Sequence, residues 1–341
     1  MINIAVVILN WNGEKLLKQF LPSFINYTKR EDTKIYIADN ASSDNSVDFI
    51  KNNYPQIELV INDKNYGFAE GYNQALKKIN ANYYVIINSD VEVTENWIDG
   101  LYDTINSDEK IAAVQPKLKS FRDKNYFEYA GAAGGMIDKY GYTFCRGRIF
   151  NVFEEDKNQY EKQTKIFWAS GACIFIKAKL FHEVGGFDAD FFAHMEEIDL
   201  CWRLKNRGYD IVYTPKSTVY HVGGATLDES NPFKTYLNFR NNLFLLYKNL
   251  SDNYFYRIFF ARMILDGVAG IKFLLSFEFK NFWAVIKAHY SFYSNIKKFK
   301  IKRSENKKNS INYVHSEIYN RSIVFDFFVK GVKEFKDLIK E

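Results

Sequence analysis

Short apolar runs alternate with amphipathic stretches through the first 115 residues, and this alternation restricts the possible folds more than any other feature. The apolar runs are rich in β-branched and aromatic residues, which predicts strands at 4–9, 34–38, 57–61, 83–87 and 111–115. Helical spacing of apolar positions between them predicts helices at 14–26, 45–53, 69–79 and 95–105. Asp44 is placed to cap the second helix. This β-α-β-α order predicts an α/β fold: a Rossmann-like, mostly parallel sheet with helices on both faces.

The rest of the chain is less regular. Residues 117–165 are rich in Gly, Tyr and charge, which predicts loops or irregular β structure over a site. A strand-like run follows at 166–177, then a helix at 196–207 and two short strands at 210–213 and 218–221. Beyond residue 233 the chain is predicted to be helical and aromatic, with a polar, basic break at 297–312. We therefore divide it into a catalytic body, 1–250, and a helical tail, 251–341.

Charge is distributed unevenly between these two parts. Residues 251–341 contain 17 Lys and Arg against 9 Asp and Glu, although the whole chain carries a net charge of only +5. A basic, aromatic tail suits an anionic membrane surface, a nucleic acid or a solvated helical appendage. Three scattered cysteines indicate a reducing compartment. Without a secretory signal or a long uncharged apolar stretch, the sequence predicts a cytoplasmic protein that does not span a membrane.

Acidic and amide side chains follow the predicted strands. Asn88, Ser89, Asp90 and Glu92 come directly after the fourth apolar run. In open α/β sheets, ligands bind at the carboxyl edge, where these side chains are expected to lie. Carboxylates at that position most often hold a divalent cation that in turn binds phosphates. The sequence therefore predicts a metal site here.

The ends of the first three strands carry similar polar groups. Asn10 and Asn12 can meet a nucleotide base or ribose, although a helix-capping turn explains them about as well. Asp39 and Asn40 suit ribose hydroxyls or a base N–H, or else a capped loop. The third strand is followed by Asn65 and Gly67, with Asn73 in the next helix.

Three carboxylates, Glu196, Glu197 and Asp199, begin the helix predicted at 196–207. A helix amino terminus favours negative charge, but three acids exceed what capping requires. Adjacent carboxylates raise each other's pKa, which helps one of them to accept a proton near neutral pH. His221 ends a later strand beside glycines and is a candidate ligand for the predicted metal.

Taken in order, these clusters resemble glycosyltransferase family 2, inverting enzymes of the GT-A fold, and especially the bacterial branch that includes rhamnosyltransferases. The matching segments span about two-thirds of the chain: VVILNWNG (6–13), ADNASSDNS (38–46), NYGFAEGYN (65–73), INSDVEV (87–93), ASGACIFIK (169–177), GGFDADFFAHMEEIDLCWRL (185–204) and YHVGGAT (220–226). One such segment is a weak signal, but the ordered set is specific.

The resemblance implies a role for each cluster. The residues it assigns to nucleotide-sugar binding are Asn10, Asn12, Asp39, Asn40, Asn65, Gly67, Asn73, Asn88, Ser89 and Asp90. Its metal, Mg²⁺ or Mn²⁺, would be held by Asp90 and His221, with Glu92 acting through water. Glu197 or Glu196 would be the general base, and Ser170, Gly171 and Asp199 would meet the acceptor.

Two residues depart from the family pattern. Asn88 replaces the first acid of the Asp-x-Asp motif, which leaves Asp90 as the main carboxylate for the metal. Glu197 replaces the usual aspartate base, which leaves open which of the two glutamates accepts the proton.

The implied partners are a UDP-, dTDP- or GDP-sugar and a glycan or polyprenyl-diphosphate-linked acceptor of cell-surface polysaccharide biosynthesis. The tail would rest on the inner face of the cell membrane, and no nucleic acid is expected. Two alternatives fit the sequence less well. A nucleotidyltransferase should carry a Gly- and Lys-rich phosphate loop, yet residues 10–15 offer only Gly13 and Lys15. A non-catalytic nucleotide- or glycan-binding module would not need carboxylates at most of the expected positions.

Overall fold

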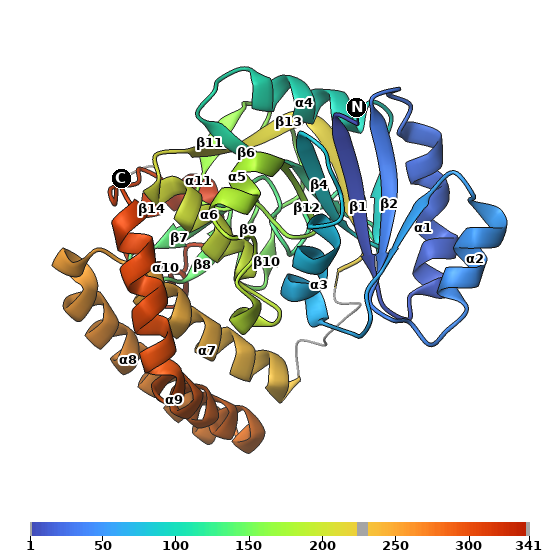
Figure 1. Cartoon of the computed structure of the whole chain (residues 1–341). Coiled ribbons are helices and arrows are strands. Elements are labelled where there is room, and N and C mark those ends of the chain that lie inside the picture. The colour runs from blue at the N-terminus through green and yellow to red at the C-terminus, as the bar shows by residue number, and fades with distance from the viewer. Residues whose placement is uncertain (1, 224–230, 339–341) are drawn as a thin grey trace.

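A mixed sheet forms the centre of the molecule (Figure 1). The computed structural model describes residues 2–223 and 231–338. Within them the main sheet has the strand order β11-β13-β6-β12-β4-β1-β2-β3, and β5 pairs with the end of β13. Its strands are β1 (Ile4–Asn10), β2 (Thr33–Asp39), β3 (Glu58–Ile61), β4 (Tyr83–Asn88), β5 (Val91–Val93), β6 (Ile111–Ser120), β11 (Thr164–Ile166), β12 (Cys173–Lys177) and β13 (Asp210–His221).

Helices cover both faces of this sheet, as the sequence predicts. One face buries the apolar sides of α1 (Glu14–Tyr27), α2 (Ser46–Asn53) and α4 (Trp97–Asn106). The other face buries α3 (Gly67–Leu76), α5 (Ala178–Glu183) and α6 (Glu196–Asn206). β1 pairs in parallel with β2 and β4, and β2 with β3, so these four strands end at one edge.

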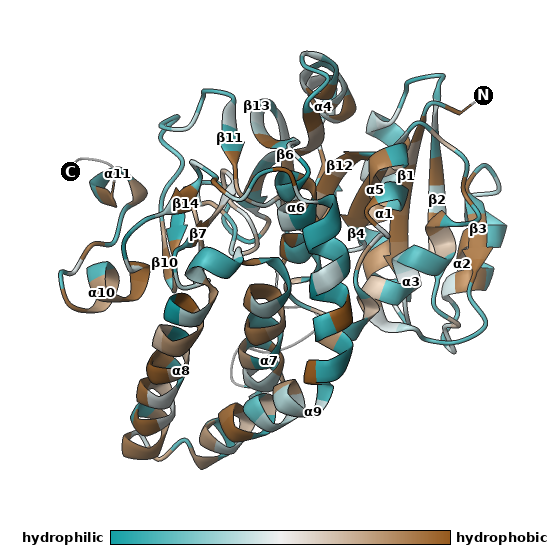
Figure 2. Cartoon of the chain, turned by 60° about the vertical axis from the view of Figure 1, so that its left-hand side comes forward, coloured by the Kyte–Doolittle hydropathy of each residue, from teal (hydrophilic) through white to brown (hydrophobic). Residues whose placement is uncertain are grey.

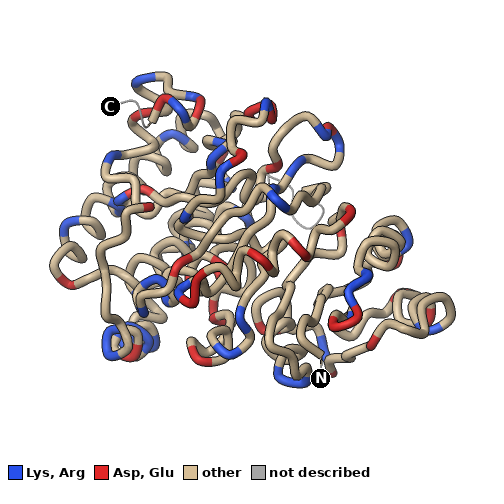
Figure 3. Tube along the Cα trace, turned by 90° about the horizontal axis from the view of Figure 1, so that it is seen from above, with Lys and Arg blue, Asp and Glu red and all other residues tan. Residues whose placement is uncertain are grey.

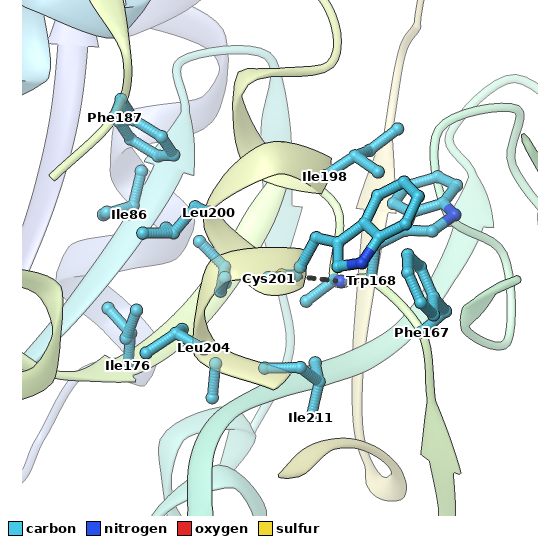
Figure 4. Close-up of a cluster of buried hydrophobic side chains, with 14 of the residues drawn as sticks. Ile86, Phe167, Trp168, Ile176, Phe187, Ile198, Leu200, Cys201, Leu204 and Ile211 are labelled. Carbon is cyan, nitrogen blue, oxygen red and sulfur yellow. Dashed lines mark hydrogen bonds between the residues drawn. The ribbon is translucent and has the colours of Figure 1, made fainter. Parts of the chain in front are cut away.

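Helix α6 is held against the sheet by apolar packing (Figure 4). Burying one such side chain contributes about 1.5–3 kcal/mol, so this contact fixes the helix firmly. The residues that meet there are Leu200, Cys201 and Leu204 of α6 and Ile86, Ile176 and Ile211 of the sheet. This packing sets the position of the glutamates at the start of α6.

Several predicted elements differ in the structure. The run at 166–177 is divided between β11 and β12, and β12 lies antiparallel between β4 and β6. The two short strands at 210–221 form a single strand, β13, with a register shift between Tyr213 and Thr218. The stretch at 117–165 contributes most of a second sheet, ordered β10-β9-β8-β7-β14. Its strands are β7 (Gly135–Asp138), β8 (Thr143–Cys145), β9 (Arg148–Ile149), β10 (Val152–Phe153) and β14 (Ile318–Tyr319).

The carboxyl-terminal part is mainly helical, as predicted, with α7 (Pro232–Asn249), α8 (Asp252–Leu275), α9 (Phe279–Asn309), α10 (Ile323–Phe328) and α11 (Phe335–Leu338). The predicted break at 297–312 is wrong for most of its length, since α9 continues to Asn309. Lys298 and Lys302 pair with Asp190, and Arg303 pairs with Asp252, so acidic partners compensate the basic run.

The tail also packs into the body. Phe292 and Phe299 of α9 belong to the same buried cluster as the α6 face, and β14 pairs with β7. Figures 1 and 2 show α8 and α9 extending from the body beside α7. In the described part of the chain, no helix is both long and apolar enough to cross a bilayer.

Candidate active site

Polar side chains meet where β1, β2 and β4 end. Asn10 lies opposite Asp39 in the strand register, and Leu9 lies opposite Asn88. The amide of Asn10 donates to Asp39 Oδ2 (2.8 Å), and Asp39 also accepts from the backbone N–H of Ser42 (2.8 Å). Both side chains are buried, and Asn10 Oδ1 has no partner within the described chain. The edge therefore offers a free acceptor oxygen beside an ordered carboxylate.

The loops beside this edge are held by local hydrogen bonds. Asn12 Oδ1 accepts from the backbone N–H of Ser43 (2.8 Å). Asp44 accepts from the backbone N–H groups of Glu14 (3.0 Å) and Ser46 (3.1 Å). Asp44 thus joins the starts of α1 and α2, although Asn45 is the residue directly before α2. Asn12 and Asp44 shape the loop next to the predicted nucleotide position.

Three other residues predicted to contact the nucleotide bind the protein itself. Asn40 donates to the carbonyl of Gly67 (2.8 Å), and Asn65 accepts from the Gly67 N–H (2.9 Å). Asn73 donates to the carbonyl of Phe187 (2.8 Å) and accepts from its N–H (3.0 Å). These side chains fix the start of α3 and the loop that leads to α6.

Asp90 and His221 come together at the end of β4 and β13. His221 Nε2 lies 3.1 Å from Asp90 Oδ1 and 3.4 Å from the amide nitrogen of Asn88. On the other side of the ring, Nδ1 lies 3.2 Å from Glu128 Oε1. Burial alone would lower the pKa of His221, but Glu128 and Asp90 more than offset it and raise this pKa to about 10. Glu128 was not predicted from the sequence.

Glu92 and Ser89 stand apart from this pair. Glu92 forms an ion pair with Lys124, and it lies opposite Tyr220, one residue before His221, in the β5–β13 register. Because side chains alternate along a strand, Glu92 and His221 face opposite sides. Ser89 is partly exposed in the turn. Among the described residues, no group of three His, Cys, Asp or Glu side chains is arranged to hold a metal.

The two glutamates at the start of α6 have different surroundings. Glu196 is 4% exposed, and burial, with Glu197 beside it, raises its pKa well above the ordinary value. Glu197 is only partly buried. Burial also raises the pKa of Glu197, to about 7, although backbone N–H groups partly offset the shift. One carboxylate oxygen of each residue lacks a partner within the described chain.

A cavity of about 470 Å³ lies in front of Glu197, and Glu196 is not among the residues that line it in the described chain. Gly171 lies next to Glu197, because a Cβ added there would lie 3.9 Å from Cβ of Glu197. The wall of the cavity also contains aromatic and basic side chains that were not predicted from the sequence. They are Tyr129, Tyr142, Arg148, Trp168, Lys234, Phe239 and Arg262.

Ser170 and Asp199, also predicted to meet the acceptor, are buried in hydrogen bonds. The backbone N–H of Ser170 donates to Gln115 (2.9 Å). Asp199 accepts from Arg203 (2.8 Å), Lys248 (2.8 Å) and Asn249 (2.9 Å). An acceptor can reach Asp199 only if this network opens. Of the last matching segment, residues 224–226 lie outside the described part of the chain.

The fold, together with the polar edge where β1, β2 and β4 end, defines an α/β glycosyltransferase of the GT-A class. The chain belongs to glycosyl transferase family 2, since that family's model matches residues 5–185, more than half of the sequence. It is 25% identical over 236 residues to an N-acetylglucosaminyl-diphospho-decaprenol L-rhamnosyltransferase from Mycobacterium tuberculosis, covering 64% of this chain and 75% of the relative. It is also 25% identical over 227 residues to the rhamnosyltransferase WbbL of Escherichia coli, covering 64% of this chain and 83% of that relative.

Solved structures share the fold at low sequence identity. GalNAc-T7, crystallised with UDP, GalNAc and Mn²⁺, matches with a TM-score of 0.58 and 17% identity, over 75% of this chain and half of its own. The mannosyltransferase PcManGT of Pyrobaculum calidifontis, in complex with GDP-mannose and Mn²⁺, matches with a TM-score of 0.52 and 14% identity. This match covers 90% of this chain and 79% of the mannosyltransferase chain. Both likenesses support the fold assignment.

Proposed function

We propose that this glycosyltransferase moves a sugar, with inversion, from a nucleoside-diphosphate sugar to an acceptor hydroxyl. The nucleotide lies at the edge formed by Asn10 and Asp39. The observation that carries this proposal is the position of Glu197, a carboxylate with a pKa near 7 that opens onto a cavity. Family membership supplies the reaction class.

Glu197 is the general base of this reaction. Its carboxylate takes the proton from the acceptor hydroxyl while the hydroxyl oxygen forms a bond to the anomeric carbon. The bond from that carbon to the diphosphate breaks, and its electron pair leaves with the diphosphate. General base catalysis of this kind contributes roughly 10²–10⁴-fold. Burial raises the pKa of Glu196 well above the ordinary value, which favours its neutral form beside Glu197.

The residues at the end of β4 fit a divalent cation. Asp90 Oδ1 and His221 Nε2 are 3.1 Å apart, close enough for both to bind one ion once His221 has lost its proton. They supply two ligands, and the donor diphosphate is expected to supply others. Bound Mg²⁺ or Mn²⁺ would act as a Lewis acid that neutralises charge on the leaving diphosphate. Glu92, paired with Lys124, would contribute little.

The acceptor is a lipid-linked glycan, and the hairpin of α8 and α9 rests on the inner face of the cell membrane. Large apolar side chains are exposed along the hairpin, beside Arg257, Lys272 and Lys280, which favours an anionic lipid surface. These apolar residues include Tyr256, Phe260, Leu275, Phe277, Phe279, Trp283 and Tyr290. Acidic and basic residues are otherwise interspersed along the trace (Figure 3). The relative from Mycobacterium tuberculosis, whose name specifies a decaprenol-linked substrate, supports this acceptor class.

Calorimetry with UDP, GDP and dTDP, with and without Mn²⁺, tests the donor site. We expect one nucleotide to bind in a metal-dependent manner, and Asp90→Asn to weaken that binding by about tenfold or more, because a carboxylate ligand is lost. Glu92→Gln is the matched control and should bind like the wild type. Equal metal dependence in Asp90→Asn would contradict the assignment of Asp90.

A further inference from the structure

The cavity in front of Glu197 contains two cations that form no ion pair with the described residues. Arg262, in its wall, is neutralised by Asp266, whose carboxylate lies 2.7 Å from the guanidinium Nε. Arg148 and Lys234 also line the cavity, yet neither has a carboxylate within 4.0 Å among the described residues. The cavity therefore has an excess of positive charge on the side where these two residues lie.

Arg148 is held in place but incompletely bonded. It is only 6% exposed, and its guanidinium donates to the carbonyl of Phe150 (3.1 Å) and to Sγ of Cys145 (3.6 Å). Its Nε has no partner in the described chain. Leaving a buried cation unpaired is costly, and an anionic ligand would remove that cost.

A single ring lies against both cations. The guanidinium carbon of Arg148 is 4.4 Å from the ring centroid of Tyr129, and Lys234 Nζ is 5.3 Å from it. His194 lines the same cavity, and its Nε2 is buried without a partner in the described chain. Burial, with Lys234 nearby, lowers the pKa of His194 to about 4, so the ring is a neutral hydrogen-bonding group. The cavity is thus lined by two cations, Arg148 and Lys234, that form no ion pair with the described residues, and by the unpartnered Nε2 of His194.

We propose that Arg148 and Lys234 form a subsite for a phosphoryl group carried by the acceptor, opposite the hydroxyl that Glu197 deprotonates. This inference rests on the proposed function and specifies its acceptor as a phosphate- or diphosphate-linked sugar. The subsite is separate from the donor diphosphate, because Asp90 and His221 are not among the described residues that line the cavity.

The wall of the cavity continues into the hairpin. Thr235 at the start of α7 donates to Asn281 near the start of α9 (2.9 Å), and Phe239 contacts Phe273 of α8 with ring centroids 6.5 Å apart. A phosphoryl group held by Arg148 and Lys234 therefore lies on the side from which a lipid chain can extend along α8 and α9.

Calorimetry in EDTA, which removes the metal needed at the donor site, tests the subsite. The probes are inorganic pyrophosphate and farnesyl diphosphate, added to the full chain. We expect pyrophosphate to bind the wild type, and Lys234→Met and Arg148→Met each to raise its Kd about tenfold, the effect of losing one charge-assisted hydrogen bond. Lys18→Met, on the far helix α1, is the control and should leave the Kd unchanged.

The two probes distinguish the sources of the phosphoryl group. Tighter binding of farnesyl diphosphate supports a lipid-linked acceptor, and equal binding supports a soluble glycosyl phosphate at the same subsite. Absence of pyrophosphate binding, or an unchanged Kd in a folded Lys234→Met variant, would overturn the inference. Loss of metal-dependent nucleotide binding in Lys234→Met would also overturn the inference, because it would place Lys234 in the donor site. If the wild type binds no nucleotide even with Mn²⁺, the proposed function fails instead.

Discussion

Position alone distinguishes the two adjacent glutamates at the start of α6. Glu196 and Glu197 have the same side chain and begin the same helix, but only Glu197 lines the cavity. Packing of α6 on the sheet determines which of the two faces the cavity. The Asp-to-Glu departure from the family pattern therefore still leaves a carboxylate at the cavity, where we propose that the base acts.

The pH dependence of transfer should follow Glu197. The base must be ionised, so protonation of Glu197 as the pH falls through about 7 should lower kcat/KM. Below this pKa, kcat/KM should fall about tenfold for each further pH unit. We expect a rise between about pH 6 and about pH 8, measured at a fixed metal concentration. Donor binding measured at each pH is the control for changes at His221. A pH profile of kcat/KM with its midpoint near 4.5, the ordinary pKa of glutamate, would contradict the claim that burial raises the pKa of Glu197.

At the scale of elements, the loop before α6 and the first turn of α6 are tied to two carboxyl-terminal helices. Lys248 of α7 lies 2.7 Å from Asp188 Oδ2 and 2.8 Å from Asp199 Oδ2. Lys302 of α9 pairs with Asp188 and Asp190. The tail therefore helps to hold the segment that carries the glutamates, in addition to any contact with a membrane.

Replacing Lys302 with Met should loosen this segment. We expect Lys302→Met to lower the free energy of unfolding by about 1–3 kcal/mol, because Asp188 and Asp190 lose a largely buried partner. It should also lower kcat while leaving the Kd for nucleotide nearly unchanged. Lys308→Met, exposed on the same helix, is the control. Thermal denaturation and steady-state kinetics measure both effects, and equal stability of the two variants would contradict the role of Lys302.

Most regular elements of the first 115 residues could be predicted to within about three residues, because their hydrophobic periods are strong. The exceptions are β5, a three-residue strand that was not predicted, and β6, which continues to Ser120 instead of ending at residue 115. The small second sheet could not, since β9 and β10 have two residues each and show no period. Helix α9 was underestimated because the acids that pair with its basic run lie far away in sequence.

Prediction of the site had a similar limit. Strand ends correctly indicated that Asp90 and His221 would meet, but no local signal marked Glu128 beside His221 or Arg148 in the cavity that Glu197 also lines. Asn73 resembles a ligand contact in sequence, yet it binds the backbone of Phe187, 114 residues away. Such pairings depend on tertiary contacts that one sequence does not display.

At the scale of the whole molecule, the hairpin of α8 and α9 sets the orientation that we propose on a membrane (Figure 2). Leu275 and Phe277, where α8 ends, are 76% and 80% exposed, and Trp283 follows in α9. Deleting residues 251–341 would also remove Phe292 and Phe299 from the core, so point substitutions give the cleaner test.

Replacing Leu275, Phe277 and Trp283 together with Ser should weaken binding to anionic liposomes at least about tenfold, because each inserted side chain contributes about 1.5–3 kcal/mol. Co-flotation with vesicles measures the effect. A variant with Phe325→Ser and Phe328→Ser, which removes exposed apolar rings from α10 instead, should still float. Equal flotation of the triple variant and the wild type would contradict membrane contact through the hairpin.

The most direct test of the central claim is a comparison of Glu197→Gln with Glu196→Gln in sugar transfer and in nucleotide binding. We predict that Glu197→Gln lowers kcat roughly 10²–10⁴-fold with an unchanged Kd for the nucleotide, because only proton removal is lost. Glu196→Gln should keep most of the activity, since glutamine resembles the protonated acid that burial maintains there. Full activity in Glu197→Gln, or loss of activity confined to Glu196→Gln, would contradict the assignment of the base.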